Sequence, residues 1–257
     1  MSDSPCRSEV RRDGQWLHLF LDKPKGNILD LQMLGAIEAA LDDQIPQLPA
    51  LKLVVFEGVG KHFSFGASVE EHLPETVGDM LPAFHDLFRK LESTSIPTAA
   101  VVRGQCLGGG MELAAWCGRL VCTPTAAFGV PEVKLAVFPP IAALLLPWRC
   151  GGQRGSEVVY SGRTVKAAEA VEIGLADQCA EDPTAALEEW FEKNLAGNSA
   201  LAIRYAWQAS RMEIAEALQN RLPKLEALYL KDLMSHEDPV EGIRSFIERR
   251  PAQWRHR

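Results

Sequence analysis

The spacing of hydrophobic and polar positions divides this 257-residue chain into two parts. In the first half, short apolar runs alternate with longer segments whose apolar positions recur with helical period. Strands are predicted over residues 16–21, 51–57, 98–102 and 120–122, and amphipathic helices over residues 31–41 and 80–91. Strands separated by helices need crossover connections, so the pattern predicts a largely parallel sheet in an α/β fold.

From about residue 166 onward the pattern is mainly helical. Separate helices are predicted over residues 183–194, 199–219 and 222–234, and Pro223 is compatible with the first turn of the last one. Neither a linker nor a repeat separates the two parts. We therefore expect an α/β core over residues 1–195 and a helical region over residues 196–257, within one continuous architecture.

Composition excludes several classes of protein. With 47% hydrophobic residues, the chain is long enough to bury a large core. Its longest apolar run, residues 135–148, is too short to span a bilayer and is broken by prolines. Residues 1–12 are polar and lack the apolar core of a signal peptide, so we expect a cytoplasmic protein without membrane association.

Cysteines, histidines and net charge narrow the expected partners. The cysteines lie far apart without a CxxC pair, which favours buried free thiols in a reducing compartment: Cys6, Cys106, Cys117, Cys122, Cys150 and Cys179. The histidines, including His62 and His85, show no ligand spacing, so no metal is expected. A net charge of −7 argues against a general nucleic-acid binder. An anionic ligand would need local cations, for which Lys23, Lys25 and the basic tail (Arg249, Arg250, Arg255, Arg257) are candidates; solvated surface charge explains each of them equally well.

A glycine-rich turn carries the strongest chemical signal. Residues 108–113, Gly-Gly-Gly-Met-Glu-Leu, follow the predicted strand 98–102 and open a predicted helix over 109–117. Glycines let the backbone approach a ligand and point free N–H groups at it. Because Glu112 would repel a phosphate, the arrangement instead suits a carbonyl that gains negative charge beside an acid–base group. Taken alone, most such turns are structural, and Glu112 would be a glutamate favoured by the helix dipole.

Further motifs along the chain favour the functional explanation of this turn over the structural one. A second glycine-bearing loop, Phe-Ser-Phe-Gly-Ala-Ser, occupies residues 63–68, and a second acid follows in Phe-Gly-Val-Pro-Glu at 128–132. With residues 21–27, 161–163, 168–170, 174–175 and 241–246, these motifs resemble the crotonase (enoyl-CoA hydratase/isomerase) superfamily along nearly the whole chain. The resemblance implies a crotonase-like spiral of ββα units followed by a helical trimerisation region. It also implies a homotrimer or a dimer of trimers, with CoA as part of the substrate and no separate cofactor.

The same resemblance implies roles for individual residues. The N–H groups of Ala67 and Gly109 match those that form the oxyanion hole for a thioester, and Gly66 precedes the first of them. Glu112 and Glu132 match the two acid–base glutamates of the hydratases. Isomerases and decarboxylases of the superfamily often lack one glutamate, so the pair favours a hydro-lyase. Which glutamate is acid and which is base stays open, and so does the reading of Glu132 as a simple surface residue.

Two departures from the common pattern narrow the expected substrate. Ser68 replaces an aspartate after Gly66-Ala67, and Pro139-Pro140-Ile141 replaces a glycine-rich run. Proline fixes φ and removes an N–H, so this wall of the pocket should be stiff and apolar. The expected lining is Phe65, Ser68, Phe138, Pro140 and Ile141, with Lys23, Lys25 and Gly66 expected to bind CoA.

Together these segments resemble the subfamily that hydrates cyclohexa-1,5-diene-1-carbonyl-CoA to 6-hydroxycyclohex-1-ene-1-carbonyl-CoA in anaerobic benzoyl-CoA degradation. The alternatives are a straight-chain enoyl-CoA hydratase, an enoyl-CoA isomerase, and a non-catalytic acyl-CoA-binding protein. Loss of a glutamate would mark the last of these, and both glutamates are present.

Overall fold

A computed structural model describes residues 4–257, so the first three residues of the expected α/β core lie outside it. The main sheet has six strands in the order β1-β2-β3-β4-β6-β9. These strands are β1 (Cys6–Arg11), β2 (Trp16–Leu21), β3 (Leu53–Gly58), β4 (Thr98–Val102), β6 (Arg119–Cys122) and β9 (Gln178–Cys179). Only β1 is antiparallel to its neighbour. The predicted, largely parallel α/β sheet is therefore confirmed.

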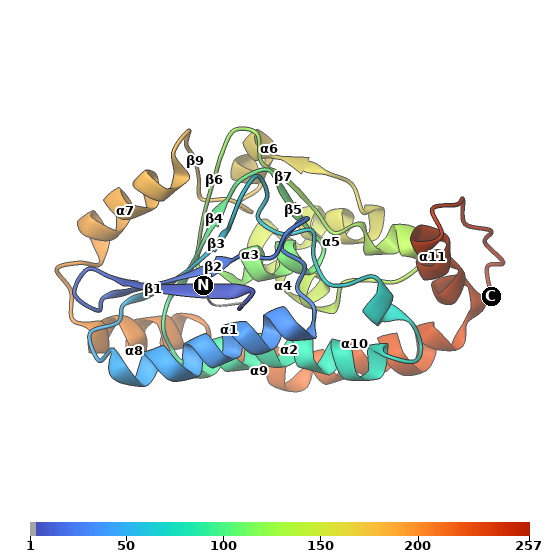
Figure 1. The fold of residues 1–257 in the computed structure, drawn as a ribbon, viewed down its shortest axis with the longest axis horizontal. Helices are drawn as coiled ribbons and strands as arrows, with labels where there is room; N and C mark the ends of the chain where they lie inside the picture. Colours follow the sequence, from blue (N-terminus) through green and yellow to red (C-terminus); the bar gives the residue numbers. More distant parts are fainter. Residues whose placement is uncertain (1–3) are drawn as a thin grey trace.

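Alternating side chains of β3 explain why this sheet is covered on both faces. Val54 and Phe56 belong to the main core, together with side chains of α1 (Leu31–Gln44) and α2 (Val77–Ser93). Leu53 and Val55 belong to a second cluster with α7 (Pro183–Asn194). Successive strand residues point to opposite faces, so a nearly continuous apolar run fits a strand that is buried on both sides. Figure 1 shows α1 and α2 below the sheet and α7 beyond its other face.

A smaller sheet brings the two predicted glutamates to one edge. It has the order β5-β7-β8, formed by β5 (Gln105–Leu107), β7 (Ala127–Gly129) and β8 (Val165–Lys166). Strands β5 and β7 are parallel, and the Gly108 N–H donates to the Gly129 carbonyl at 2.8 Å. Helix α3 (Gly109–Trp116) follows β5, and the 3₁₀ helix η3 (Pro131–Leu135) follows β7. Because parallel strands end at the same edge, Glu112 and Glu132 start from neighbouring positions.

Helices connect this small sheet to the rest of the core. Helix α4 (Pro140–Cys150) follows η3, then α5 (Gly152–Ser161) and α6 (Ala167–Glu172). Two further 3₁₀ turns are η1 (Ile45–Gln47) and η2 (Glu70–His72). In residues 4–257 no helix is both long and apolar enough to cross a membrane.

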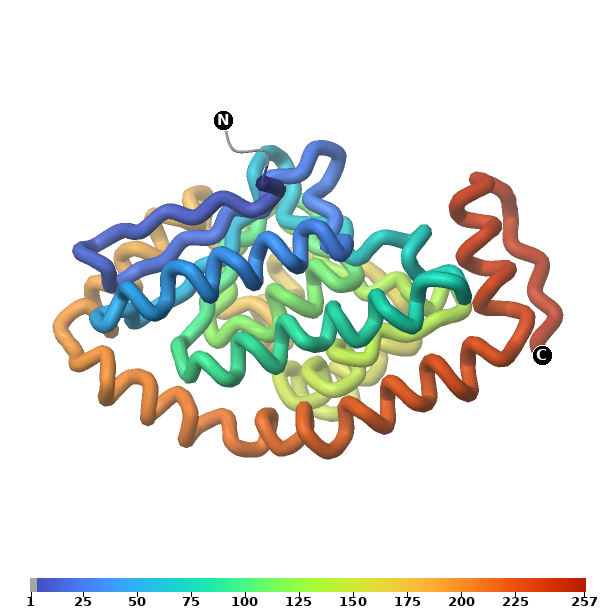
Figure 2. The backbone as a smooth tube through the Cα atoms, turned by 60° about the horizontal axis from the view of Figure 1, so that its bottom comes forward, coloured from blue at the N-terminus to red at the C-terminus, as the bar shows by residue number. Residues whose placement is uncertain are grey.

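The C-terminal region is helical, as predicted, but more segmented. It consists of α8 (Ala200–Ser210), α9 (Met212–Asn220), α10 (Leu222–Ala227), a π-helical turn η4 (Leu228–Asp232), a 3₁₀ turn η5 (Leu233–Ser235) and α11 (Glu237–Ile247). These helices follow one side of the molecule as a curved belt (Figure 2). Pro223 does lie in the first turn of α10, whereas the single helix expected over residues 199–219 is wrong.

The interruption at Arg211 has a packing cause. Its backbone leaves helical geometry, with φ −110° and ψ 9°. Its buried guanidinium pairs with Glu92 at 3.0 Å and lies 4.2 Å from the ring centre of Trp116. The chain bends here because this cation reaches its partners in α2 and α3.

Candidate active site

Two loops from different parts of the chain meet backbone to backbone at the centre of the site. A Cβ atom on Gly66 would lie 2.7 Å from the Leu107 carbonyl oxygen and 3.0 Å from the Gly109 nitrogen. Gly66 also has φ +99°, a conformation that side chains disfavour. A Cβ atom on Gly109 would lie 3.2 Å from the Ala67 nitrogen. Only glycine therefore allows this approach.

The N–H groups of Ala67 and Gly109 are the two donors at this junction. Within residues 4–257, neither donates a hydrogen bond to the protein. Both residues line the same cavity, and Gly109 is the first residue of α3, whose first-turn N–H groups have no partner within the helix. The structure thus places side by side the two residues for which the sequence predicted an oxyanion hole.

The first loop is held in shape by a third segment. The Ser64 hydroxyl donates to the Asn27 carbonyl at 2.7 Å and accepts the Gly66 N–H at 3.0 Å. The Asn27 side-chain amide in turn donates to the Phe63 carbonyl at 3.1 Å, and the Phe65 N–H donates to the Gly26 carbonyl at 2.8 Å. These bonds fix the direction of the Ala67 N–H, and the side chain of Ala67 takes no part in them.

Glu112 is buried at the first turn of α3, with 3% of its surface exposed. Its Oε1 accepts the Ala142 N–H at 2.7 Å. Burial raises the pKa of Glu112 to about 7, although the N–H groups of Ala142 and Ile141 act in the opposite direction. The carboxyl can therefore gain or lose a proton near neutral pH.

Glu132 projects from η3 toward the same cavity. Its Oε1 lies against Gly108, where a Cβ atom would come within 2.8 Å. Its Oε2 is inaccessible to solvent and has no hydrogen-bond partner among the described residues. Burial, and then the charge of Glu112, hold the pKa of Glu132 well above its usual range. Glu132 is thus half-buried, with its carboxyl turned into the protein. Of the two carboxyls Glu112 ionises first, because backbone N–H groups stabilise its charge.

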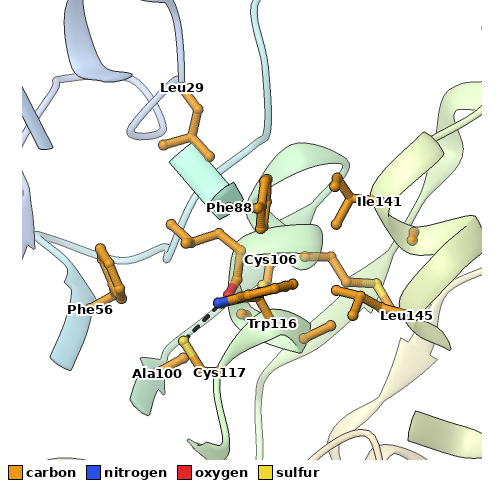
Figure 3. Packing of buried hydrophobic residues seen from close by; sticks show 14 of the residues in the cluster. Leu29, Phe56, Phe88, Ala100, Cys106, Trp116, Cys117, Ile141 and Leu145 are labelled. Atoms are coloured by element: carbon orange, nitrogen blue, oxygen red, sulfur yellow. Dashed lines mark hydrogen bonds between the residues drawn. The ribbon is translucent and has the colours of Figure 1, made fainter. Parts of the chain in front are cut away.

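The two carboxyls lie at the wall of a partly open, mostly apolar cavity of about 80 Å³. Of the predicted pocket residues, Phe65, Phe138 and Pro140 line it, together with Ala67 and Gly109. Two predictions for this wall are wrong, because Ser68 and Ile141 do not line the cavity. The Ser68 hydroxyl is bound to Glu70 at 3.2 Å, and Ile141 lies beside Leu145 in the main core (Figure 3).

The predicted CoA-binding residues lie on or beside the first loop, outside the cavity lining. Lys23 forms an ion pair with Asp30 and donates to Gln32 at 3.2 Å. Lys25 is exposed on the turn that packs against Phe65 through Gly26. Gly66 supplies the tight backbone but no lining surface. In the basic tail, Arg250 is paired with Glu241 and Arg257 with Glu237. Lys23, Arg250 and Arg257 are thus paired within the chain, and CoA binding by Lys23, Lys25 and Gly66 stays a prediction.

Some lining residues escape sequence analysis. Met80, Leu81 and Phe84 of α2, His72 of η2 and Tyr229 of η4 reach the cavity from the rim. Burial lowers the pKa of His72, and its Nδ1 contacts the Ser68 carbonyl oxygen at 2.6 Å. Met80 and Phe84 lie in the helix predicted over residues 80–91, but the sequence did not show that they face the cavity. Nothing in the local sequence distinguished Tyr229 from an ordinary core tyrosine.

The similar proteins and the solved structure reported below are all hydratases of CoA thioesters by name. Residues 16–257 match the family described as enoyl-CoA hydratase/isomerase. The chain is 43% identical over 256 residues to the cyclohexa-1,5-dienecarbonyl-CoA hydratase of Thauera aromatica, covering 100% of this chain and 99% of that protein. It is 30% identical to the 2,3-dehydroadipyl-CoA hydratase of Escherichia coli, covering 96% and 98%. Among solved structures, an enoyl-CoA hydratase from Mycobacterium avium superposes with a TM-score of 0.85 at 22% identity, covering 98% of this chain and 100% of that one.

Proposed function

We propose that this chain, which belongs to the enoyl-CoA hydratase/isomerase family, is a hydro-lyase that adds water to cyclohexa-1,5-diene-1-carbonyl-CoA. The observation that carries the substrate assignment is the 43% identity, over the whole of both chains, to the Thauera aromatica hydratase of that thioester. The product is 6-hydroxycyclohex-1-ene-1-carbonyl-CoA. A cyclic dienoyl thioester differs from a benzoyl thioester by two hydrogens, so reduction of a benzoyl thioester would supply this substrate in aromatic degradation.

Charge develops on the thioester oxygen when the oxygen atom of water bonds to the conjugated ring. We infer that this oxygen lies between the N–H groups of Ala67 and Gly109, which are close together and have no other acceptor in residues 4–257. Such donors are already oriented, so they stabilise the extended enolate without rearrangement. Removing one oxyanion-hole donor typically lowers kcat by about 10²–10³.

The different pKa values of Glu112 and Glu132 support different roles for the two carboxyls in proton transfer. Glu112 ionises near pH 7 and would accept a proton from the attacking water. Glu132 stays protonated and would deliver its proton to carbon at the far end of the extended enolate. One proton is taken and one is given, so the addition balances, and transfer of a proton from Glu112 to Glu132 restores the starting state. Hydration is redox-neutral and these groups supply both proton transfers, so we propose that no cofactor takes part.

The shape of the wall supports a ring as substrate. Phe138 and Pro140 line the cavity, and the prolines hold the start of α4 without glycine flexibility. A ring that fills a rigid apolar space loses little conformational freedom on binding. A flexible crotonyl group would leave part of that space empty, at about 1–3 kcal/mol for each missing buried methylene.

Ultraviolet-monitored hydration of the cyclic dienoyl-CoA and of crotonyl-CoA tests this assignment. We expect kcat/KM to favour the cyclic diene by roughly tenfold or more. Equal efficiency with both thioesters would leave a hydratase without the proposed specificity. Binding of either without turnover would instead support a non-catalytic acyl-CoA-binding protein.

We also propose that the enzyme is a homotrimer or a dimer of trimers and acts in the cytoplasm. Exposed apolar side chains on the C-terminal helices support the assembly. Free thiols at all six cysteines, five of them buried, support a reducing compartment.

A further inference from the structure

Tyr229 is a polar group of the cavity that the proposed mechanism does not use. Its side chain is 1% exposed, and its hydroxyl oxygen has no hydrogen-bond partner in residues 4–257. It comes from η4, where its ring packs against Phe138 at 5.4 Å between ring centres. For packing alone, a phenylalanine ring would suffice, so the buried hydroxyl needs a different explanation.

A second polar atom of the same cavity is also without a partner. Glu132 Oε2 is buried and accepts no hydrogen bond from the described residues. A buried polar atom without a partner is unfavourable, and folded proteins rarely leave one unsatisfied. Glu132 and Tyr229 line the same mostly apolar cavity. An oxygen atom bound there would satisfy both groups.

The environment keeps the phenol neutral. Burial, and then the charges of Glu132 and Glu112, raise the pKa of Tyr229 above its usual range. A neutral phenol can both donate and accept a hydrogen bond, whereas an ionised carboxylate can only accept. Tyr229 therefore adds a hydroxyl that can both donate and accept a hydrogen bond to a cavity that also holds two carboxyls and His72.

We propose that the Tyr229 hydroxyl holds the oxygen atom that is added to the ring, first as the attacking water and then as the hydroxyl of the product. This inference rests on the proposed function. A bound water typically has two to four polar partners, and Tyr229, Glu132 and Glu112 provide three. Because the phenol both donates and accepts, it can hold this oxygen on either side of the reaction.

Tyr229→Phe tests the proposal because it removes only the hydroxyl. We expect kcat for hydration to fall about tenfold, the effect of losing one hydrogen bond between neutral groups. A more specific readout is ligand affinity in a Glu112→Gln background, which suppresses turnover. There, Tyr229→Phe should weaken binding of 6-hydroxycyclohex-1-ene-1-carbonyl-CoA about tenfold and leave cyclohex-1-ene-1-carbonyl-CoA, which lacks the hydroxyl, unchanged.

Tyr160→Phe is the matched control, because this tyrosine is 69% exposed on α5 and should change neither affinity. Equal losses for both ligands, or no loss for either, would show that Tyr229 serves packing alone. If the unsubstituted enzyme failed to hydrate the cyclic diene, the proposed function would be refuted. Calorimetry with the two ligands measures the role of Tyr229 separately, because it does not depend on turnover.

A second measurement leaves Tyr229 in place. The chain has three tyrosines, so Tyr160→Phe combined with Tyr205→Phe leaves Tyr229 as the only phenol. In this double variant, the hydroxylated ligand should change the ultraviolet difference spectrum of the phenol and the ligand without a hydroxyl should not. Identical difference spectra for the two ligands would overturn the proposal.

Discussion

At the scale of single residues, the two buried carboxyls should be needed for turnover but not for binding. Glu112→Gln and Glu132→Gln keep the size of the side chain and remove its acid–base chemistry. We expect each to lower kcat by roughly 10² or more while thioester affinity measured by calorimetry changes little. Glu172→Gln, at an exposed position of α6, is the control. Near-normal turnover in either active-site variant would rule out the two-carboxyl mechanism.

The raised pKa of Glu112 also predicts how stability depends on pH. Burial raises its pKa from 4.5 to about 7, so the folded state holds this proton more tightly than the unfolded state. The resulting stability is present below about pH 4.5 and is lost as pH rises through 7. A shift of this size corresponds to about 3 kcal/mol, because one pKa unit is about 1.4 kcal/mol.

Glu112→Gln should therefore melt at nearly the wild-type temperature at pH 5 and several degrees higher at pH 8. Glutamine can still accept the Ala142 N–H, and it avoids burying a charge. Thermal unfolding at the two pH values measures the difference, and Glu172→Gln should show none. If the Glu112→Gln variant were less stable than wild type at pH 8, the charge of Glu112 would not be a cost to the fold.

At the scale of elements, the meeting of the two loops depends on glycine. An alanine Cβ at position 109 would press on the Phe84 ring at 2.9 Å and on the Ala67 nitrogen at 3.2 Å. Gly109→Ala should thus move the two N–H donors apart and lower kcat by roughly 10²–10³, the usual effect of a lost oxyanion donor. Gly78→Ala in α2 meets no atom within 4 Å and should keep full activity while adding about 0.4–1 kcal/mol of stability. Equal activities in the two variants would contradict the assignment.

Some elements could be predicted from the sequence and others could not. The bounds of β2, β4 and α7 agree with the predictions, because each has a strong apolar pattern or a proline start. Strand β1 was missed because it is a mostly exposed edge strand whose polar residues give no apolar alternation. Strands β5 and β7 have three residues each and form through tertiary pairing, β5 with β7 and β7 also with β8.

The residues of the site also divide into those that the sequence could predict and those that it could not. The two glycine loops and the two glutamates were predicted from their resemblance to the superfamily motifs, because the turn and Glu112 taken alone also fit a structural role. The structure brings both loops and both carboxyls together. Ile141 was misplaced because an apolar residue after prolines fits a pocket wall and a core equally well. Tyr229 and Phe84 reach the cavity only through packing of η4 and α2 against it, which no local pattern encodes.

At the scale of the whole molecule, the C-terminal belt leaves apolar side chains uncovered. Helix α8 has no buried residue, and Leu201 and Tyr205 are each 66% exposed on it. Residues four apart lie on one face of a helix, so these two form a continuous surface. In α9, Met212 is 69% exposed. We propose that a second copy of the chain covers this surface in the proposed trimer.

Leu201→Glu should weaken that assembly, because a charge in an apolar interface cannot be solvated when subunits associate. Light scattering at micromolar concentration should report a trimer or hexamer for the wild type and smaller species for Leu201→Glu. Lys193→Glu, at an exposed polar position of α7, makes an even larger change in charge outside this surface and should leave the assembly intact. A single chain already brings both glutamates and Tyr229 to its cavity, so a dissociated subunit should keep the carboxyl pair. A wild-type monomer, or an assembly insensitive to Leu201→Glu, would show that the exposed face of α8 is not the contact between subunits.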